Sequence, residues 1–170
     1  MRHGSLSRLR AGVVSDTHGF LDPRVLQLYT GVDLILHAGD VGDPSILDEL
    51  SDVSPVIAVR GNVDEGSGLE HLPESISLSV AGVSIYMTHI YTPPGGGASG
   101  DPLPPGTRVV IFGHSHIPFL QESGSPGTRV LCFNPASAGR KRFGKPRLAG
   151  MLTIGPDGVQ AEHLDLESPE

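Results

Sequence analysis

The stretch Val13 to Gly19 reads VVSDTHG, and it places an acid and a histidine at the end of an apolar run. The residues from Leu9 to Ser15 are typical of a buried strand, which Asp16 and His18 follow directly. The carboxyl ends of the strands in an open parallel sheet meet at one edge, where ligands bind. An extended chain would turn Asp16 and His18 to the same side, so we expect both to hold one ion there.

Short apolar runs and turn signals along the chain predict an α/β fold. Helices are expected at Asp22–Tyr29 and Asp43–Leu50, because each begins with an N-capping Asp followed by Pro. They separate three expected parallel strands, at residues 9–15, 34–38 and 55–59. Further strands are expected at residues 75–80, 83–88, 109–112, 130–133, 148–154 and 159–164, with tight turns at 81–82 and 155–158. The predicted architecture is two packed mixed β-sheets flanked by helices, an αββα sandwich.

Length and composition favour a single domain over residues 1–170. We expect residues 1–8 to be a flexible extension and the Pro/Gly-rich residues 92–107 to form a surface loop, with a lid over the site as the alternative. The net charge of −7 argues against a general nucleic-acid binder. No apolar stretch approaches the roughly 20 residues of a membrane helix, and the opening residues lack a secretory signal. The lone Cys132 is expected to be buried. A cytoplasmic protein without a membrane partner is therefore expected.

Four further expected strands end in side chains that bind metal ions. The full candidate set, in chain order, is Asp16, His18, Asp40, Asn62, His89, His114 and His116. Imidazole and carboxylate together suit divalent transition ions. Seven ligands are too many for one ion, and there is no cysteine set for a closed zinc site. Two ions that share a carboxylate fit this count.

The motifs that carry these residues occur in a recognisable order. They read SDTHG, HAGDV, RGNVD, TH and GHSH, followed by Asn134-Pro135-Ala136-Ser137. This order resembles the calcineurin-like metallophosphoesterase superfamily. The short chain is similar to its small bacterial and archaeal phosphodiesterase branch, to which the retromer vacuolar-sorting subunit of the same fold is related. The resemblance covers roughly residues 9 to 165.

The resemblance implies a role for each candidate residue. It implies that one ion is held by Asp16, His18 and His116, that the other is held by Asn62, His89 and His114, and that Asp40 bridges the two. A hydroxide between the ions would attack phosphorus in line. The catalytic residues would be Asp40, Asn62 and His89, and the ions Mn, with Fe, Zn, Ni or Co as alternatives.

The implied function is hydrolysis of small phosphodiesters, with a small phosphorylated substrate as the partner. Two alternatives are a non-catalytic metal-binding scaffold of the same fold and a cyclic-nucleotide phosphodiesterase. The sequence leaves the oligomeric state open, a homodimer included.

The chain departs from the family pattern at the rim of the expected site. Val63 follows Asn62 where many superfamily phosphatases have a histidine, which leaves protonation of the leaving group unassigned. Ile90 and Tyr91 stand where the branch usually has Gly-His, and the loop at 92–107 replaces a helix common in relatives. Ala136 occupies a position that is often glycine. The small branch also lacks the histidine at position 63, and the change at Ala136 is minor, so it is the changes at Ile90-Tyr91 and at the loop that predict weak activity or an altered substrate range.

Other polar residues near the motifs have less certain roles. Asp64 either orients a water molecule or is a turn residue. His37 lies inside a strand and is expected to be structural, whereas His3, His71 and His163 are expected at the surface. The basic residues of 140–147 are either a phosphate-steering rim or a solvated loop or oligomer contact. The glycines beside Asp40, Asn62 and His114 are expected to allow sharp turns.

Overall fold

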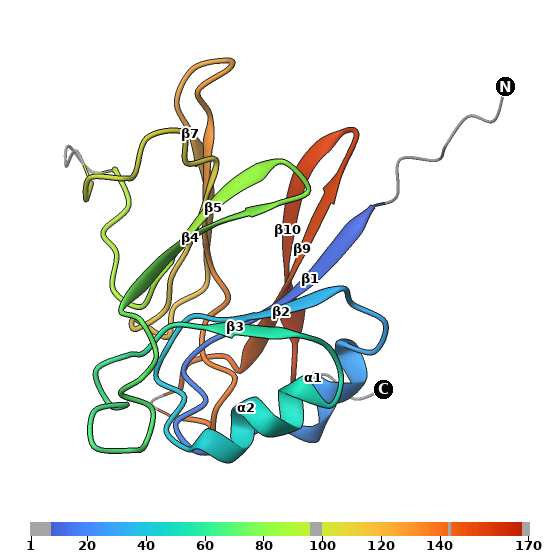
Figure 1. The fold of residues 1–170 in the computed structure, drawn as a ribbon, viewed down its shortest axis with the longest axis vertical. Coiled ribbons are helices and arrows are strands. Elements are labelled where there is room, and N and C mark those ends of the chain that lie inside the picture. Colours follow the sequence, from blue (N-terminus) through green and yellow to red (C-terminus); the bar gives the residue numbers. More distant parts are fainter. Residues whose placement is uncertain (1–7, 96–99, 143, 168–170) are drawn as a thin grey trace, which may run out of the picture.

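The computed structural model describes residues 8–95, 100–142 and 144–167, and two five-stranded sheets pack face to face in it (Figure 1). The first sheet, in the order β10-β9-β1-β2-β3, consists of β1 (Leu9–Val14), β2 (Leu34–His37), β3 (Val56–Ala58), β9 (Leu148–Gly155) and β10 (Gly158–Asp165). The second, in the order β4-β5-β6-β8-β7, consists of β4 (Ser75–Val80), β5 (Val83–Thr88), β6 (Val109–Ile111), β7 (Phe119–Ser123) and β8 (Val130–Asn134). Both sheets mix parallel and antiparallel pairs, so the predicted fold class is confirmed.

Two helices, α1 (Pro23–Leu28) and α2 (Pro44–Ser51), begin as the sequence predicts. The side chain of Asp22 accepts a hydrogen bond from Arg24 N, and that of Asp43 accepts one from Ser45 N, both at 2.9 Å. Each cap satisfies an amide that the first turn leaves free. Both helices cover the outer face of the first sheet, where their apolar side chains form a second core (Figure 1). Neither helix of the described ranges is long and apolar enough to cross a membrane.

The parallel pairs bring strand ends from both sheets to one end of the sandwich. Strands β1, β2 and β3 run parallel to one another, as do β5, β6 and β8. The amide of His114, after β6, donates to Asp16 Oδ2, after β1, at 3.1 Å, and so joins the two sheets. We call this end the site end. The opposite end carries the predicted Ala81–Gly82 and Gly155–Gly158 turns, both confirmed, and we call it the turn end.

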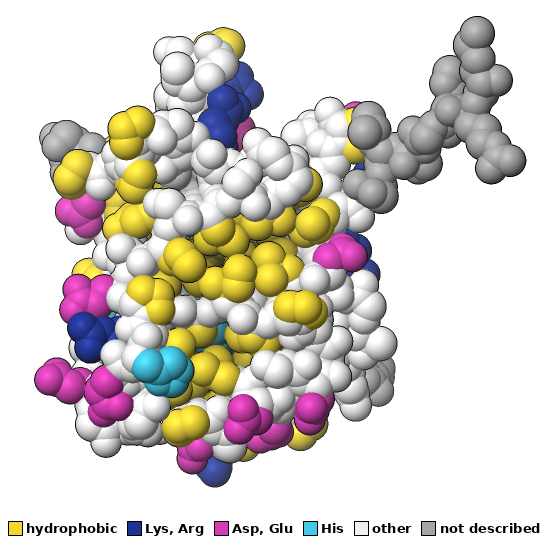
Figure 2. All heavy atoms as spheres, in the orientation of Figure 1, with side chains coloured by type: hydrophobic (Ala, Val, Ile, Leu, Met, Phe, Trp, Pro, Cys, Tyr) yellow, Lys and Arg dark blue, Asp and Glu magenta, His cyan; other side chains and the backbone are white. Residues whose placement is uncertain are grey.

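The core between the sheets fixes how these ends face each other. Leu36, Met87, Ile111 and Phe133 are almost fully buried in it. Along the β3 and β4 edges the apolar layer reaches the surface, and Figure 2 shows it as a yellow band between these strands. The buried layer therefore holds the strand ends in a fixed frame, which polar side chains occupy at the site end.

The structure also corrects and extends the predicted elements. Strand β7 was not expected, because its sequence FLQES is mostly exposed at the sheet edge and offers little apolar pattern. Residues 96–99 of the expected loop lie outside the described residues. On its described flanks, Asp101 N donates to Thr92 O at 2.9 Å, and Leu103 packs on the cluster of Tyr91 and Phe112. Residues 1–7 of the expected extension also lie outside the described residues, and Cys132 is buried as predicted.

Candidate metal centre

Six of the seven predicted ligands form two groups at the site end. The first group is Asp16, His18 and His116, and the second is Asp40, His89 and His114. Within each group one ligand atom per residue lies within 4.8 Å of the others. The seventh residue, Asn62, lies beside the second group, with Oδ1 3.2 Å from Nδ1 of His114. All seven side chains therefore meet at one end of the fold.

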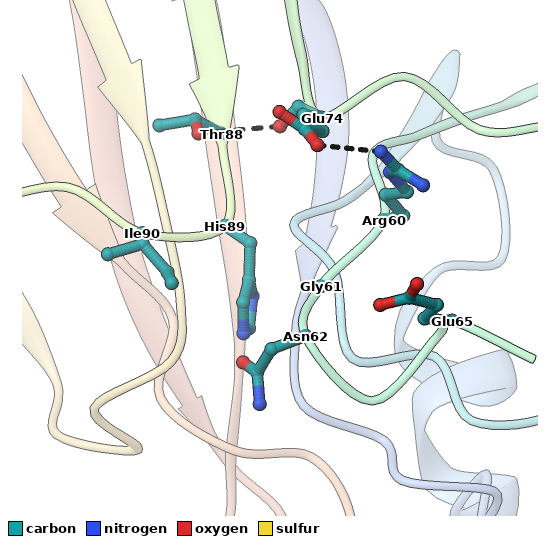
Figure 3. Close-up of a pocket in the computed structure, with 8 residues that line it drawn as sticks. All are labelled: Arg60, Gly61, Asn62, Glu65, Glu74, Thr88, His89 and Ile90. Atoms are coloured by element: carbon teal, nitrogen blue, oxygen red, sulfur yellow. Dashed lines mark hydrogen bonds and ion pairs between the residues drawn. The ribbon is translucent and has the colours of Figure 1, made fainter. Parts of the chain in front are cut away.

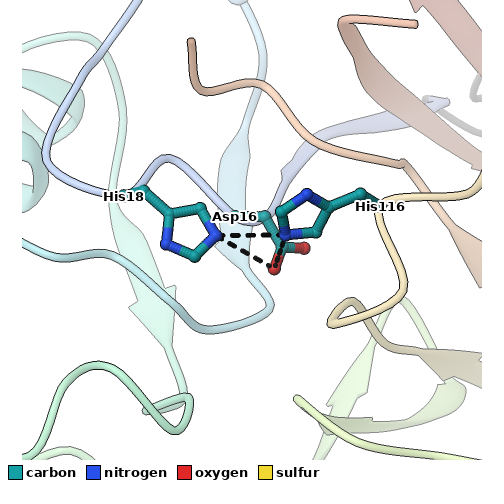
Figure 4. Close-up of side chains that lie close together, drawn as sticks. All are labelled: Asp16, His18 and His116. Atoms are coloured by element: carbon teal, nitrogen blue, oxygen red, sulfur yellow. Dashed lines mark hydrogen bonds and ion pairs between the residues drawn. The ribbon is translucent and has the colours of Figure 1, made fainter. Parts of the chain in front are cut away.

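The first group surrounds a carboxylate oxygen that has no hydrogen-bond partner in the described part of the chain (Figure 4). Asp16 Oδ1 lies 3.2 Å from Nε2 of His116 and 3.8 Å from Nε2 of His18. The side chain of Asp16 is completely buried, and Oδ1 accepts no hydrogen bond from the described residues. A buried acceptor without a partner costs about 1–3 kcal/mol. A cation between the carboxylate and the two imidazoles would remove this cost, so the group fits a metal ion.

Asp40 stands between the two groups. Its Oδ2 lies 3.2 Å from Nε2 of His89 and 3.7 Å from Nε2 of His18. The Nε2 atom of His89 is buried and has no hydrogen-bond partner among the described residues. One oxygen of Asp40 thus faces nitrogen atoms of both groups, which is the arrangement that a shared carboxylate requires.

The remaining atoms of these ligands are fixed by the protein. Ser15 Oγ donates to Asp16 Oδ2 at 2.6 Å, and Val63 N donates to Asp40 Oδ1 at 3.0 Å. His89 donates its Nδ1 proton to Ala38 O at 2.8 Å, which leaves the Nε2 lone pair free. Such contacts orient metal ligands and set their basicity. Sequence reasoning assigned no role to Ser15, although it stands in the opening motif, because a serine before an acid carries no periodic signal.

Five of the ligands adopt left-handed backbone conformations. The φ angles are 57° at Asp16, 49° at His18, 54° at Asp40, 70° at His114 and 58° at His116. The expectation that the chain is extended from Asp16 to His18 is therefore wrong, because both residues are turned out of the strand. Such conformations cost about 1–3 kcal/mol each in residues other than glycine, and they cluster at functional sites.

Of the glycines beside Asp40, Asn62 and His114, one confirms the expected sharp turn and two do not. Gly39 has a positive φ, of 93°, whereas Gly61 and Gly113 have none. A Cβ at Gly61 would overlap Oδ1 of Asp40, and one at Gly113 would overlap Oγ of Ser15. A Cβ at Gly39 would lie 2.7 Å from Nδ1 of His89. All three glycines are therefore required because the backbone passes directly against a ligand or against the residue that orients one.

The surroundings of Asp40 favour its ionised form. Burial opposes ionisation of Asp40, but the close imidazole of His89 and the hydrogen bond from the Val63 amide outweigh it, so the pKa of Asp40 is lowered. Burial also opposes protonation of His89, yet the close carboxylate of Asp40 and the charge of Asp16 raise its pKa. The pKa of His18 is lowered, mainly by burial. The ionised Asp40 thus provides the negative charge that a cation site requires.

His37 is structural, as predicted. The imidazole is fully buried, donates from Nε2 to Thr17 Oγ1 at 3.0 Å and accepts at Nδ1 from the amide of Gly39 at 3.2 Å. Burial lowers the pKa of His37 to about 4. A neutral His37 therefore ties the SDTHG loop to the HAGD loop without facing the candidate ions.

Asp64 is a structural residue of its turn, which settles the choice that the sequence left open. It is fully buried and accepts hydrogen bonds from the amides of Gly61 (2.7 Å), Gly42 (2.8 Å) and Val41 (3.2 Å). One carboxylate therefore joins the loop after β2 to the loop after β3. Asp40 and Asn62, which lie on these two loops, are held in register by it.

Two further residues make contacts that the sequence did not predict. Asn134 is fully buried, and its amide donates to Gly113 O at 2.9 Å, so it positions the GHSH loop directly. The expectation that His163 lies at the surface is wrong. Its ring is half-buried against Phe133, with centroids 4.9 Å apart, and its Nε2 donates to Asn134 O at 2.8 Å. His71 is exposed as predicted, and His3 lies outside the described residues.

A cleft of about 480 Å³ opens beside the second group (Figure 3). Asn62 and His89 lie together at one end of it, and the ion pair of Arg60 with Glu74, at 2.6 Å, lies at the other. Ile90 also lines the cleft and is 57% exposed, at the position where the sequence departs from the family pattern. The cleft is large enough to hold a small organic group beside the second group.

Comparison with known protein sequences agrees with these features. The sequence model described as the calcineurin-like phosphoesterase superfamily domain matches residues 9–157. A probable metallophosphoesterase of Methanothermobacter thermautotrophicus is 32% identical over 168 residues, covering 93% of each chain. The phosphodiesterase YfcE of Escherichia coli is 28% identical over 163 residues, covering 81% of this chain and 84% of that one.

Solved structures extend the likeness to the fold. The structure of Escherichia coli YfcE, described as a phosphoesterase, superposes with a TM-score of 0.62 at 25% identity, covering 94% of this chain and all of that one. Vacuolar Protein Sorting 29 of Cryptosporidium parvum superposes with a TM-score of 0.69 at 18% identity, covering 96% and 94%. The second likeness is one of fold alone.

Proposed function

Because the chain belongs to the calcineurin-like phosphoesterase superfamily, we propose that it hydrolyses small phosphodiesters with two divalent ions bound at the site end. The observation that supports two ions is the position of Asp40 Oδ2 between His18 and His89. The two buried atoms without partners, Asp16 Oδ1 and His89 Nε2, point to a cation in each group. The phosphodiesterase among the relatives supports the substrate class.

The residues divide between the two ions as the groups do. Asp16, His18 and His116 would hold the first, Asn62, His89 and His114 would hold the second, and Asp40 would contact both. This mixture of nitrogen and oxygen donors suits Mn and the other transition ions from Fe to Zn. When bound, two such ions act as Lewis acids toward the phosphoryl oxygens and lower the pKa of the attacking water.

The chain itself positions the substrate. Asn62 and His114 are the exposed residues among the proposed ligands of the second ion, so a phosphate reaches the centre from their side. The adjoining cleft takes the organic group of the ester, with Ile90 as its apolar contact. Val63 offers no proton to the leaving alcohol. We therefore expect esters of acidic alcohols, such as nitrophenol, to be the faster substrates.

Substitution of Asp40 tests the proposal. Bis(4-nitrophenyl) phosphate should be hydrolysed by protein loaded with Mn²⁺, and elemental analysis should give two ions per chain. Asp40→Asn should lower the rate by about a hundredfold or more, because metal-ion catalysis provides several kcal/mol of transition-state stabilisation. Asp52→Asn, at the exposed end of α2, removes the same charge away from the site and should change neither quantity.

The same assay separates the proposal from its alternatives. Two bound ions without turnover on monoesters, diesters and cyclic phosphates would instead support the metal-binding scaffold. A strong preference for cyclic nucleotides would support the cyclic-nucleotide phosphodiesterase. Fewer than two ions per chain at saturating Mn²⁺ would refute the shared-carboxylate centre.

A further inference from the structure

A strongly basic segment adjoins the first group of the metal centre. Residues 140–147 contain five of the twelve Lys and Arg residues of a chain whose net charge is −7. A small hollow is lined by His116 together with Arg140, Arg142 and Lys145. The segment follows Ser137, whose Oγ donates to Asp16 O at 2.9 Å. The positive charges are therefore connected to the metal centre through both packing and hydrogen bonding.

Three of the five basic side chains are already engaged within the protein. Lys145 Nζ donates a hydrogen bond to the carbonyl oxygen of Ser115 at 2.7 Å, and Ser115 is the residue between His114 and His116 in the sequence. Arg147 pairs with Asp22 and donates to Gly139 O. Lys141 pairs with Glu167 at 3.0 Å. These contacts hold the segment against the site.

The other two, Arg140 and Arg142, form no ion pair with a carboxylate of the described residues. The guanidinium carbon of Arg140 lies 4.5 Å from the centre of the Phe20 ring, which is a cation–π contact. The side chain of Arg142 lines the same hollow as the ligand His116, so it lies beside the first group. Two exposed guanidinium groups beside a metal centre are suited to bidentate binding of a phosphate or carboxylate.

The opposite flank of the site has a different character. The cleft beside the second group is lined by Glu65 and by Glu74, which pairs with Arg60. An additional anion on the substrate would be repelled there and attracted at Arg140 and Arg142. An asymmetric diester should therefore bind with its additional anionic group toward Arg140 and Arg142 and its other group toward the cleft.

We propose that Arg140 and Arg142 form a subsite for a second anionic group of the same substrate, whose phosphodiester lies at the metal centre. The preferred substrates are then phosphodiesters that carry a further phosphate or carboxylate on the side away from the cleft. This inference rests on the proposed function, and it assigns the substrate class of that site.

Binding of nucleotides with one or two phosphates tests the subsite directly. Calorimetry on Mn²⁺-loaded protein should show thymidine 3′,5′-bisphosphate binding about tenfold more tightly than thymidine 5′-monophosphate, as expected for charged hydrogen bonds. The double variant R140Q/R142Q should reduce this ratio to near one. R8Q/R129Q removes two exposed charges at the turn end and should retain it.

A kinetic comparison separates this inference from the proposed function. Thymidine 5′-(4-nitrophenyl phosphate) with a 3′-phosphate should show a kcat/KM about tenfold above that of the ester without one, and R140Q/R142Q should abolish the preference. Turnover of neither ester, with the binding ratio intact, would refute the proposed function and leave the subsite standing. Equal affinities in the wild type, or a ratio unchanged in R140Q/R142Q, would overturn the subsite. Free inorganic phosphate that restores tight binding of the monophosphate would show that the anion need not belong to the substrate, and would also overturn the proposal.

Discussion

The chain reverses direction at both ends of the sandwich, but different residue types adopt the left-handed backbone conformations at the two ends. At the turn end the left-handed conformations fall on glycines such as Gly82, Gly127 and Gly158, with Ala81 as an exception among the described residues. At the site end they fall also on the five ligands and on Ala136. Glycine would relieve strain at either end. The site end keeps side chains in these conformations because the chemistry requires them.

Glycines at the two ends differ in the same way. A Cβ at Gly82, Gly127 or Gly158 would meet no atom within 4 Å. At Gly61 and Gly113 it would overlap a polar atom of the site. Glycine is thus chosen for backbone freedom at the turn end, and for lack of a side chain at these two positions of the site end.

Gly61→Ala should have the largest effect, because the new methyl group must displace the carboxylate of Asp40. A misplacement of about 1 Å can cost about a hundredfold in rate, and overpacking costs about 1–3 kcal/mol of stability. Gly127→Ala, at the turn end, should cost about 1–2 kcal/mol through its φ of 87° and leave kcat unchanged. Steady-state kinetics and urea unfolding check both. Equal loss of activity in the two variants would remove the distinction between the ends.

His37→Gln should reveal a dependence of stability on pH that originates at the site end. The pKa of His37 is about 4 in the folded protein, against 6.5 for an ordinary histidine. As the pH falls below 6.5 the unfolded chain gains a proton that the folded protein does not bind until about pH 4. The folded state should thus lose about 3 kcal/mol across this window. The variant keeps a donor for Thr17 but cannot titrate, so it should lack this loss.

The measurement is urea unfolding of the metal-free wild type and of metal-free His37→Gln at several pH values. The other histidines are the same in both proteins, so the difference between the two curves reports on His37. His71→Gln, at an exposed position, serves as the control and should follow the wild type. Parallel curves for wild type and His37→Gln would contradict the assigned role of burial.

The smallest effects concern the two alanines with positive φ. Ala81 is exposed with φ of 48°, so Ala81→Gly should stabilise the protein by about 0.5–1 kcal/mol, the relief of strain exceeding the added freedom of the unfolded chain. Ala136 has φ of 70° but is fully buried. Its glycine variant also loses a buried methyl group worth about 0.8 kcal/mol, so it should gain little. Thermal unfolding of the two variants measures both changes in stability. A larger stabilisation by Ala136→Gly than by Ala81→Gly would contradict the prediction.

The sequence revealed the site because each strand stops at a residue type that rarely ends a buried run. Asp16, Asp40 and His89 each come one or two residues after an apolar run, and strand pairing then brings these strand ends together. Their family order gave the division between the two groups. The backbone strain was not predictable, since extended and left-handed conformations leave the same residue pattern.

Other features depended on contacts that no local pattern encodes. His163 looked like an isolated surface histidine, but β10 places it against Phe133, which lies 30 positions earlier in the sequence. Strand β7 pairs antiparallel with β8 at the sheet edge, where an apolar face is not needed. The role of Asp64 required knowing that two loops meet at its carboxylate.

The hydrogen bonds to Asp16 Oδ2 and Asp40 Oδ1 also bear on which cations the protein can accept in a cell. Each carboxylate offers a single oxygen to the centre, because its other oxygen is committed to Ser15 or to the Val63 amide. Calcium favours six to eight oxygen ligands and carboxylates that bind through both oxygens. Four imidazoles and two one-oxygen acids do not meet that demand. We therefore expect calcium to bind this centre more weakly than transition ions do, because of the same contacts that hold the ligands in place.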